Sequence, residues 1–338
     1  MKDKTIHYLE TFGLSPIVPM VRLASGESPK RQFQDLFEKL GLPLLAIAIF
    51  LALWSFSAAR VDTSLGTLPG PTAVYQQYLG LVDEHKAERL KEVAFYERQD
   101  KRNAEKLAKN PEATVKVRPY TGKPTFFDQI WTSLYTVFAG FVVASLIAIP
   151  LGVACGLNQK LYAAVSPLIQ IFKPVSPLAW LPIVTMVVSA VYVSDDPMFS
   201  KSFITSAVTV TLCSLWPTLI NTAMGVASID KDWINVGRVI RLHWSKQVFK
   251  IALPASLPMI FTGLRISLGI GWMVLIAAEM LAQNPGLGKF VWDEFQNGSS
   301  NSLGRIMVAV LVIGIIGFVL DWMMLSVQKL VSPQSSNA

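Results

Sequence analysis

The chain alternates between long apolar runs and polar segments, and the apolar runs have the length of membrane-spanning helices. A helix needs about 20 apolar residues to cross a hydrocarbon layer of about 30 Å. The runs that meet this requirement lie at roughly residues 43–59, 129–157, 166–194, 202–227, 255–282 and 306–328. They predict an all-α integral membrane protein with about six transmembrane helices.

Two of these runs have special features. The first begins only after about forty residues, too late for a cleaved secretory signal, so we expect a retained helix. The third contains Pro174, Pro177 and Pro182, each of which removes a backbone donor and clashes with the preceding turn. Irregular backbone within a membrane is tolerated where it is buried in protein or lines a cavity. This run is therefore expected to be interrupted and to form a gate or pathway element, with Ser176 and Trp180 as candidate residues.

The polar segments predict the orientation of the chain. The loop at 228–254 is rich in Lys and Arg, which mark short cytoplasmic loops, whereas the short loops at the other ends of the spans hold few. Counting six crossings outward from this loop places the tails at 1–42 and 329–338 in the cytoplasm as well. Residues 60–128 then lie outside, and residues 129–328 form a five-helix core.

The external segment at 60–128 is dense in charges of both signs. Its middle, 72–107, has the Glu–Lys and Glu–Arg spacings of an exposed helix, and prolines mark both ends. A solvated surface accounts for this pattern. A docking surface for an external partner is the alternative.

Composition agrees with a membrane protein. Of the 338 residues 52% are hydrophobic and 16% are charged, against about 25% charged in ordinary soluble domains. These values exclude a disordered chain, a disulfide scaffold and a collagen-like repeat. The formal charge is +7, but no basic stripe is interleaved with aromatic residues, so we expect no nucleic-acid partner. Cys155 and Cys213 fall within spans and are expected to be small buried residues.

The sequence contains no recognisable catalytic or nucleotide-binding motif. GxxxxGKS/T, HExxH and GxSxG are all missing. His7, His85 and His243 lie outside the spans, so neither a metal cluster nor a proton relay is expected within the membrane. We therefore predict no catalytic residue and no metal site in this chain.

Four charged residues fall within the expected spans: Lys173, Arg265, Glu279 and Asp321. A charge at mid-bilayer costs at least about 2.5–3.5 kcal/mol on insertion scales, so these residues are candidates for a translocation path. Arg265 and Asp321 lie at similar depth and are expected to form an ion pair. An unpaired Lys173 would face a water-filled path and attract anions. One alternative is that the side chains of Lys173 and Arg265 extend to the membrane–water interface. Another is that the pair of Arg265 and Asp321 is purely structural.

The basic loop predicts a short amphipathic helix. Its apolar residues recur at helical spacing, Ser228 or Asp230 is placed to cap the first turn, and the helix is expected to end before Leu253-Pro254. Such a helix lies on the membrane or is a contact for a partner protein. The apolar positions are Ile229, Trp233, Val236 and Ile240, and the polar positions are Asp232, Asn235, Arg238 and Arg241.

This loop resembles the conserved cytoplasmic loop of binding-protein-dependent ABC importer permeases. Ile251-Ala252-Leu253-Pro254 matches the end of the family pattern. Asn235-Val236-Gly237 and Arg241 stand where the general pattern has Glu-Ala-Ala and Gly, and the run from Asn235 to Ile240 is similar to the nitrate permease branch. The resemblance extends over about residues 43–329. Its other matching stretches are 133–141, 149–152, 174–183, 260–265, 277–280 and 286–288.

The resemblance implies the architecture and partners of a type I ABC importer permease. Such a permease would be a homodimer embedded in the lipid of a bacterial inner membrane. Two cytoplasmic ATPase subunits would bind ATP and Mg, a periplasmic substrate-binding protein would deliver the substrate, and this chain would hold no cofactor. The ATPase subunits would contact Asp232, Trp233, Asn235, Val236, Gly237, Arg238, Arg241, Leu253 and Pro254.

The substrate that the resemblance implies is a small inorganic anion, with nitrate or nitrite first. Alkanesulfonate, taurine and bicarbonate permeases have overlapping motifs and are alternatives. A membrane scaffold or a lipid-modifying enzyme is an alternative of a different class. The enzyme would need a polar catalytic cluster near an interface, where only Asp230 and Asp232 occur, and these suit a helix N-terminus instead.

Overall fold

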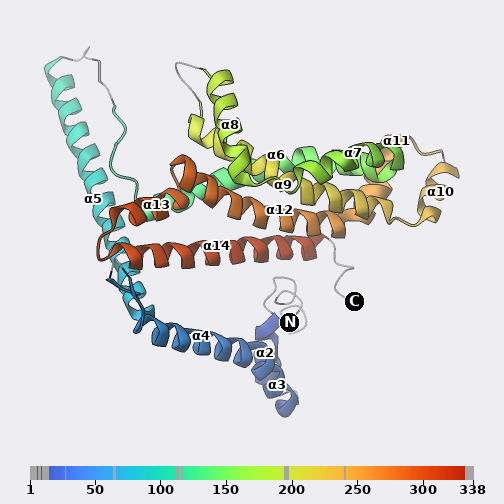
Figure 1. The fold of residues 1–338 in the computed structure, drawn as a ribbon, viewed down its shortest axis with the longest axis horizontal. Helices are drawn as coiled ribbons and strands as arrows, with labels where there is room; N and C mark the ends of the chain where they lie inside the picture. The colour runs from blue at the N-terminus through green and yellow to red at the C-terminus, as the bar shows by residue number, and fades with distance from the viewer. Residues whose placement is uncertain are drawn as a thin grey trace.

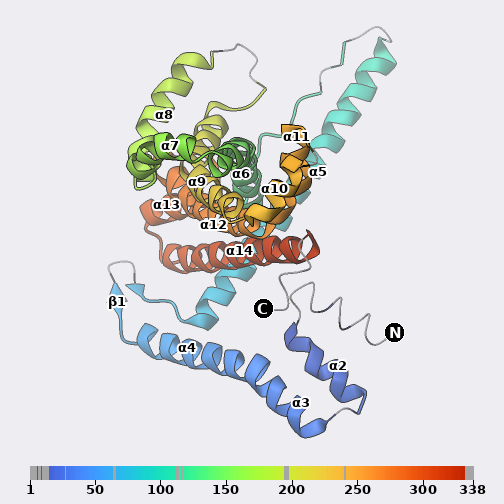
Figure 2. The same cartoon turned by 90° about the vertical axis from the view of Figure 1, so that its right-hand side faces the viewer.

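Four long helices lie side by side and form the bundle of this protein (Figures 1 and 2). The structure is a computed structural model that describes residues 6, 9, 15–26, 28–63, 66–110, 114–115, 117–193, 198–239 and 241–331. The bundle helices are α6 (Phe126–Leu157), α9 (Lys201–Ala227), α12 (Leu253–Ala282) and α14 (Ser302–Val331). Each corresponds to one of the apolar runs in the sequence.

Glycines bring α6 and α9 into close contact. A Cβ atom added at Gly140 or Gly152 would lie 2.7 Å from an atom of α9, and one added at Gly156 would lie 2.6 Å away. Small residues allow helix backbones to approach closely within a membrane. The central core between these helices is built from large apolar side chains, among them Val137, Phe141, Val210, Trp272 and Leu275.

An N-terminal helix runs beside the bundle, below α14 in Figure 1. The 3₁₀ turn η1 (Ser15–Ile17) and α2 (Val18–Ala24) come first, and α3 (Pro29–Leu36), the π-helical turn η2 (Phe37–Gly41) and α4 (Leu42–Ala58) follow as one continuous helix. The predicted span at 43–59 is therefore the end of a longer helix. The apolar side chains of α4 are largely exposed within the single chain, so lipid or another subunit must cover them.

A long charged helix lies across the α13 end of the bundle. The hairpin of β1 (Asp62–Thr63) and β2 (Gly66–Thr67) leads into α5 (Pro71–Lys109), which has 39 residues and confirms the helix predicted at 72–107. Its first half packs on α14, and its second half projects beyond the bundle (Figures 1 and 2).

The third predicted span is broken once. α7 (Gln159–Phe172) and α8 (Pro177–Val191) meet at an angle of 99°. Pro177 occupies the first turn of α8, where a missing donor costs little. The prediction that Pro182 also interrupts the span is wrong, because it removes only one hydrogen bond, to the carbonyl of Leu178, and α8 continues past it.

The fifth span starts earlier than the sequence predicts. α11 (Trp244–Gln247), the π-helical turn η3 (Val248–Ala252) and α12 are continuous from Trp244, whereas the prediction began near residue 255. The π-turn changes the hydrogen-bond register just before Pro254, so the helix accommodates the proline without ending. The remaining helices are α10 (Lys231–Val239) and α13 (Leu287–Asn297), and α13 was not predicted.

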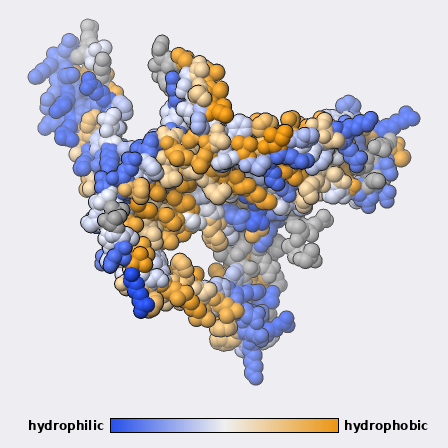
Figure 3. Space-filling view, viewed as in Figure 1, coloured by the Kyte–Doolittle hydropathy of each residue, from blue (hydrophilic) through white to orange (hydrophobic). Residues whose placement is uncertain are grey.

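Within the described residues, five helices are long and apolar enough to cross a membrane, and the bent pair α7–α8 provides a sixth. Figure 3 shows an apolar surface along the bundle between more hydrophilic ends. The predicted all-α membrane fold with about six spans is confirmed.

Candidate functional site

Helix α10 stands at the end of the bundle farthest from α13 (Figure 1). The backbone N–H of Asp232 donates to Asp230 Oδ1 at 3.0 Å, so the predicted acidic start of the helix is present. Trp233 is 65% exposed and Val239 is 81% exposed. Large apolar side chains are therefore uncovered on α10, as a contact with another subunit or with the membrane surface requires.

The predicted contact residues divide between α10 and α12. Asp232, Trp233, Asn235, Val236, Gly237 and Arg238 belong to α10, but the side chains of Val236 and Arg238, and residue Ile240, lie outside the described part of the chain. Arg241 ends this stretch with a φ of 49°, and the N–H of Leu242 donates to the carbonyl of Gly237 at 2.9 Å.

Leu253 and Pro254 lie at the base of α12 rather than next to α10. Leu253 packs in an apolar cluster that also contains Val226 and Ile229, the residues that lead from α9 into α10. Pro254 is exposed. The two parts of the predicted ATPase contact are therefore joined through this cluster.

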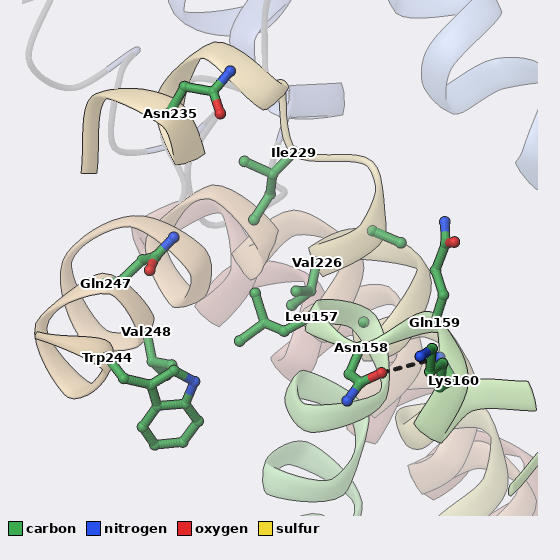
Figure 4. A pocket seen from close by; sticks show the side chains of 12 residues that line it. Leu157, Asn158, Gln159, Lys160, Val226, Ile229, Asn235, Trp244, Gln247 and Val248 are labelled. Carbon is green, nitrogen blue, oxygen red and sulfur yellow. Dashed lines mark hydrogen bonds between the residues drawn. The ribbon is translucent and has the colours of Figure 1, made fainter. Parts of the chain in front are cut away.

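A pocket of about 720 Å³ separates α10 from the turn between α6 and α7 (Figure 4). Asn235 and Gln247 border it on one side, and Asn158 and Lys160 border it on the other. The Asn158 side chain accepts a hydrogen bond from the backbone N–H of Lys160 at 3.0 Å and so caps α7.

The bend between α7 and α8 brings together the predicted residues Lys173, Ser176 and Trp180. Lys173 directly follows α7, is exposed and forms no ion pair within the described residues. Ser176 Oγ accepts from the N–H of Leu178 at 3.3 Å and caps α8. The ring of Trp180 lies 5.8 Å from Phe172. Lys173 thus lies in the short turn that leads from α7 to the N-terminus of α8, and a lysine and a helix N-terminus each attract an anion.

The predicted ion pair between Arg265 and Asp321 is confirmed. Arg265 Nε donates to Asp321 Oδ1 at 3.0 Å, and one terminal guanidinium nitrogen donates to Oδ2 at 2.8 Å. The two side chains are 31% and 51% exposed in the single chain. A two-pronged pair of this kind fixes both orientations and joins α12 to α14. Because it is partly exposed at membrane depth, water or another subunit must cover it.

Reversing one charge of this pair is expected to destabilise the subunit, and reversing both is expected to restore it. Arg265→Asp or Asp321→Arg leaves two like charges in contact, which should cost on the order of 1–2 kcal/mol for a partly exposed pair. Thermal unfolding of the purified subunit in detergent measures this loss. The double variant should recover most of it, and a double variant as unstable as the single ones would contradict a direct pair.

Glu279 has a different environment from the other three charges. Its side chain is 1% exposed, accepts from Ser133 Oγ at 2.8 Å, and accepts from the N–H of Gly288 at 3.0 Å. A Cβ atom on Gly286 or Gly288 would collide with it. Glu279 therefore fastens α12 to α6 and to the start of α13. It is buried in this conformation, and its place in the path stays a prediction.

Two partners of the candidate residues had no clear signal in the sequence. Ser133 also accepts from the N–H of Leu287 at 2.9 Å, but a serine within an apolar run gives no sign of contacts with Glu279 and Leu287, which lie 146 and 154 residues away. Trp216 lies 6.1 Å from Phe172 and completes the aromatic cluster behind the bend. The described residues contain no cluster of His, Cys, Asp and Glu that could hold a metal ion.

Comparison with known proteins places these features in a family. Residues 148–333 match the family described as binding-protein-dependent transport system inner membrane component. The chain is 33% identical over 301 residues to the bicarbonate transport system permease protein CmpB of Synechococcus elongatus, across 89% of this chain and 92% of that protein. It is 37% identical over 205 residues to the nitrate import permease protein NrtB of Synechocystis sp., and this match covers 61% of this chain and 70% of that protein.

A solved structure shows the same fold. An inward-facing structure of the MetNI methionine ABC transporter aligns with a TM-score of 0.52 at 16% identity, covering 61% of this chain and 96% of that one. The chain therefore belongs to the inner membrane components of binding-protein-dependent ABC importers, as a multi-pass plasma-membrane permease subunit that leaves ATP hydrolysis to partner subunits.

Proposed function

We propose that two copies of this subunit form the passage of an importer for a small inorganic anion. Nitrate or nitrite is the leading candidate substrate, and bicarbonate is the next. The observation that carries this proposal is Lys173, which has no ion pair among the described residues and lies beside the N-terminus of α8. A positive charge next to a helix N-terminus attracts anions and repels cations.

The depth of the bend supports this assignment. α7 has 14 residues, which corresponds to about 21 Å at 1.5 Å per residue. Lys173 then lies about two thirds of the way across a hydrocarbon layer of about 30 Å. Broken helices whose half-helix ends face the substrate are a recurring way to bind ions near the middle of a membrane.

The relatives support an anion of this size. One is named for bicarbonate and another for nitrate, and both anions are small, planar and singly charged. The single positive charge of Lys173 in each subunit matches the single negative charge of either anion. Alkanesulfonates and taurine carry an organic tail as well and are the alternatives that an uptake assay must include.

We also propose that the α10 end is cytoplasmic and that ATPase subunits hold α10. Exposed lysines gather there, including Lys160, Lys246 and Lys250, as short cytoplasmic loops require. The exposed Trp233 supplies an apolar anchor of the kind that dominates protein interfaces. Both termini and α10 would then lie on one side of the membrane, and α5 and α13 on the other.

A Lys173→Glu subunit, assembled with its ATPases and reconstituted in vesicles, is expected to import labelled nitrate at least about tenfold more slowly. The reason is that a carboxylate at this depth repels the anion, and a tenfold change corresponds to only about 1.4 kcal/mol. Parallel uptake of labelled bicarbonate, taurine and an alkanesulfonate identifies the substrate. Basal ATP hydrolysis should persist, which separates a blocked path from a misfolded complex.

Two further variants make this test specific. Lys173→Arg keeps the charge and should retain most of the uptake, whereas Lys201→Glu makes the same charge reversal at the exposed start of α9 and should change it less than about twofold. Normal uptake by the Lys173→Glu subunit would refute the proposed role of Lys173.

A further inference from the structure

The first half of α5 is fastened to the bundle. Leu81 is 2% exposed and belongs to the central core. Arg305 of α14 pairs with Glu84, and Arg89 pairs with Asp128 at the start of α6 at 3.0 Å. The position of this half is therefore fixed by apolar burial and by ion pairs to two bundle helices.

The second half of α5 is braced by the chain that returns along it. The Gln99 side chain bonds both backbone groups of Arg118, accepting from its N–H at 2.9 Å and donating to its carbonyl at 3.3 Å. The N–H of Tyr120 donates to the Tyr96 hydroxyl at 3.1 Å. The Tyr120 hydroxyl donates to Glu88 at 2.7 Å, and this hydrogen bond lowers the pKa of Glu88. The projecting part therefore has a defined shape.

We call residues 92–110, 114–115 and 117–122 the arm, and its charges differ from those of the first half of α5. In the first half, Lys86 pairs with Asp83, Lys91 pairs with Glu88, and Arg89 pairs with Asp128. In the arm, no cation forms an ion pair with any residue that the structure describes. These unpaired cations are Arg98, Lys101, Arg102, Lys106, Lys109 and Arg118.

Most of these cations line one groove of about 660 Å³ between α5 and the returning segment. The groove contains one carboxylate, Glu105, and one aromatic side chain, Phe95. In Figure 3 the far end of α5 is one of the most hydrophilic parts of the surface. Like charges held together by a braced backbone repel one another, and an anionic partner would relieve this repulsion. The cations of the groove are Arg98, Arg102, Lys106, Lys109 and Arg118.

We propose that the cationic groove of the arm is a docking surface for an acidic patch on the periplasmic substrate-binding protein. This inference rests on the orientation proposed above, which places α5 outside the cell membrane. A rigid charged surface suits such a partner because charge complementarity steers the encounter and fixes the register. The bracing of the arm also reduces the entropy lost on docking.

The shape of the groove favours a protein over a free anion or a lipid. From residue 98 to residue 109 the cations extend along about 17 Å of helix, and their side chains are exposed rather than directed at one point. A small anion would need several donors converging on it. A lipid surface would need an apolar face beside the cations, whereas the groove has only Phe95. Figure 1 also shows the far end of α5 projecting away from the bundle.

The test compares two triple variants with equal loss of charge. Arg102→Gln/Lys106→Gln/Lys109→Gln removes cations from the groove, and Lys86→Gln/Lys91→Gln/Lys101→Gln removes three exposed cations outside it. Each is assembled with its ATPases in nanodiscs of phosphatidylcholine, and the Kd of the cognate substrate-binding protein is measured at about 50 mM and about 500 mM salt. Basal ATP hydrolysis verifies that each complex is folded.

The groove variant is expected to raise the Kd about tenfold at low salt, and less than about twofold at high salt, because screening weakens exposed charge pairs. The control variant should change it less than about twofold. An unchanged Kd, or equal losses in both variants, would overturn the proposal. So would an unchanged Kd accompanied by loss of the phosphatidylglycerol that copurifies with the original complex in detergent, which indicates a lipid site, or by dissociation of the permease dimer, which indicates a contact between copies.

The outcome is distinguishable from a failure of the proposed transport function. The Lys173→Glu complex should bind the substrate-binding protein with unchanged Kd while uptake falls. If the complex transports neither nitrate nor bicarbonate, but the groove variant still weakens docking, the docking surface stands and the substrate assignment fails.

Discussion

A Gly152→Val subunit is expected to be recovered from membranes at a small fraction of the normal amount and to unfold at a lower temperature. The Cβ of any larger residue would lie 2.7 Å from the Cβ of Thr222 and 2.8 Å from the carbonyl oxygen of Leu219. Neither atom is at the flexible end of a side chain, so α6 and α9 must separate. Overpacking of this kind costs about 1–3 kcal/mol or more, and small residues at helix contacts are a main source of association within membranes.

The same substitution at Gly314 is the matched control. Gly314 lies in α14, is exposed, and has nothing within 4 Å of the position that a Cβ would take. The Gly314→Val subunit should therefore be recovered in the normal amount, and its unfolding temperature should lie within a few degrees of that of the original protein. Equal behaviour of the two variants in a detergent unfolding assay would show that the α6–α9 contact does not limit stability.

Replacing Glu279 by alanine is expected to destabilise the subunit by roughly 3–5 kcal/mol. The change would leave the Ser133 hydroxyl and the N–H of Gly288 without their acceptor in a site where the Glu279 side chain is 1% exposed, and it would open a cavity next to Gly286. The link between α6, α12 and α13 would loosen. Thermal unfolding of the purified complex, together with proteolysis of the loop before α13, measures this effect.

Asp293→Ala provides the comparison for this prediction. It removes a carboxylate from the exposed face of α13, where Asp293 pairs with Lys289 at 2.9 Å, and exposed pairs contribute about 0–1 kcal/mol. Glu279→Gln, which keeps the shape and one acceptor oxygen, should fall between the two. If Glu279→Ala unfolds at the same temperature as Asp293→Ala, the anchoring role of Glu279 is wrong.

The features that were predictable from the sequence are local or depend only on position along a helix. An apolar run of sufficient length must form a helix in a membrane because its backbone groups have no other partners there. Arg265 and Asp321 could be paired because each lies a countable number of residues from the same end of its span. The charged helix α5 followed from the periodicity of its own residues.

The features that were missed depend on partners distant in the sequence. The effect of Pro182 depended on whether the helix could absorb one lost hydrogen bond, which composition does not reveal. The polar segment at 283–305 is too short and too charged to predict a span, and α13 within it was not predicted. Hydrogen bonds that involve Glu279 and Ser133 hold the start of this helix in place. The hydrogen bonds of Glu279 were equally unpredictable, because a charge in a span is costly and only its neighbours show how that cost is met.

By itself the sequence determined that this chain is a helical membrane protein of about six spans, with a long charged helix after the first span and an amphipathic loop helix. It did so because hydrophobic length and charge periodicity act within a single helix. Only the tertiary structure decided that α7 and α8 diverge by 99° at Lys173, that Glu279 is an anchor, and that the cations of the arm are left unpaired. These features depend on which side chains from separate helices come into contact. The packing of the formed helices determines those contacts.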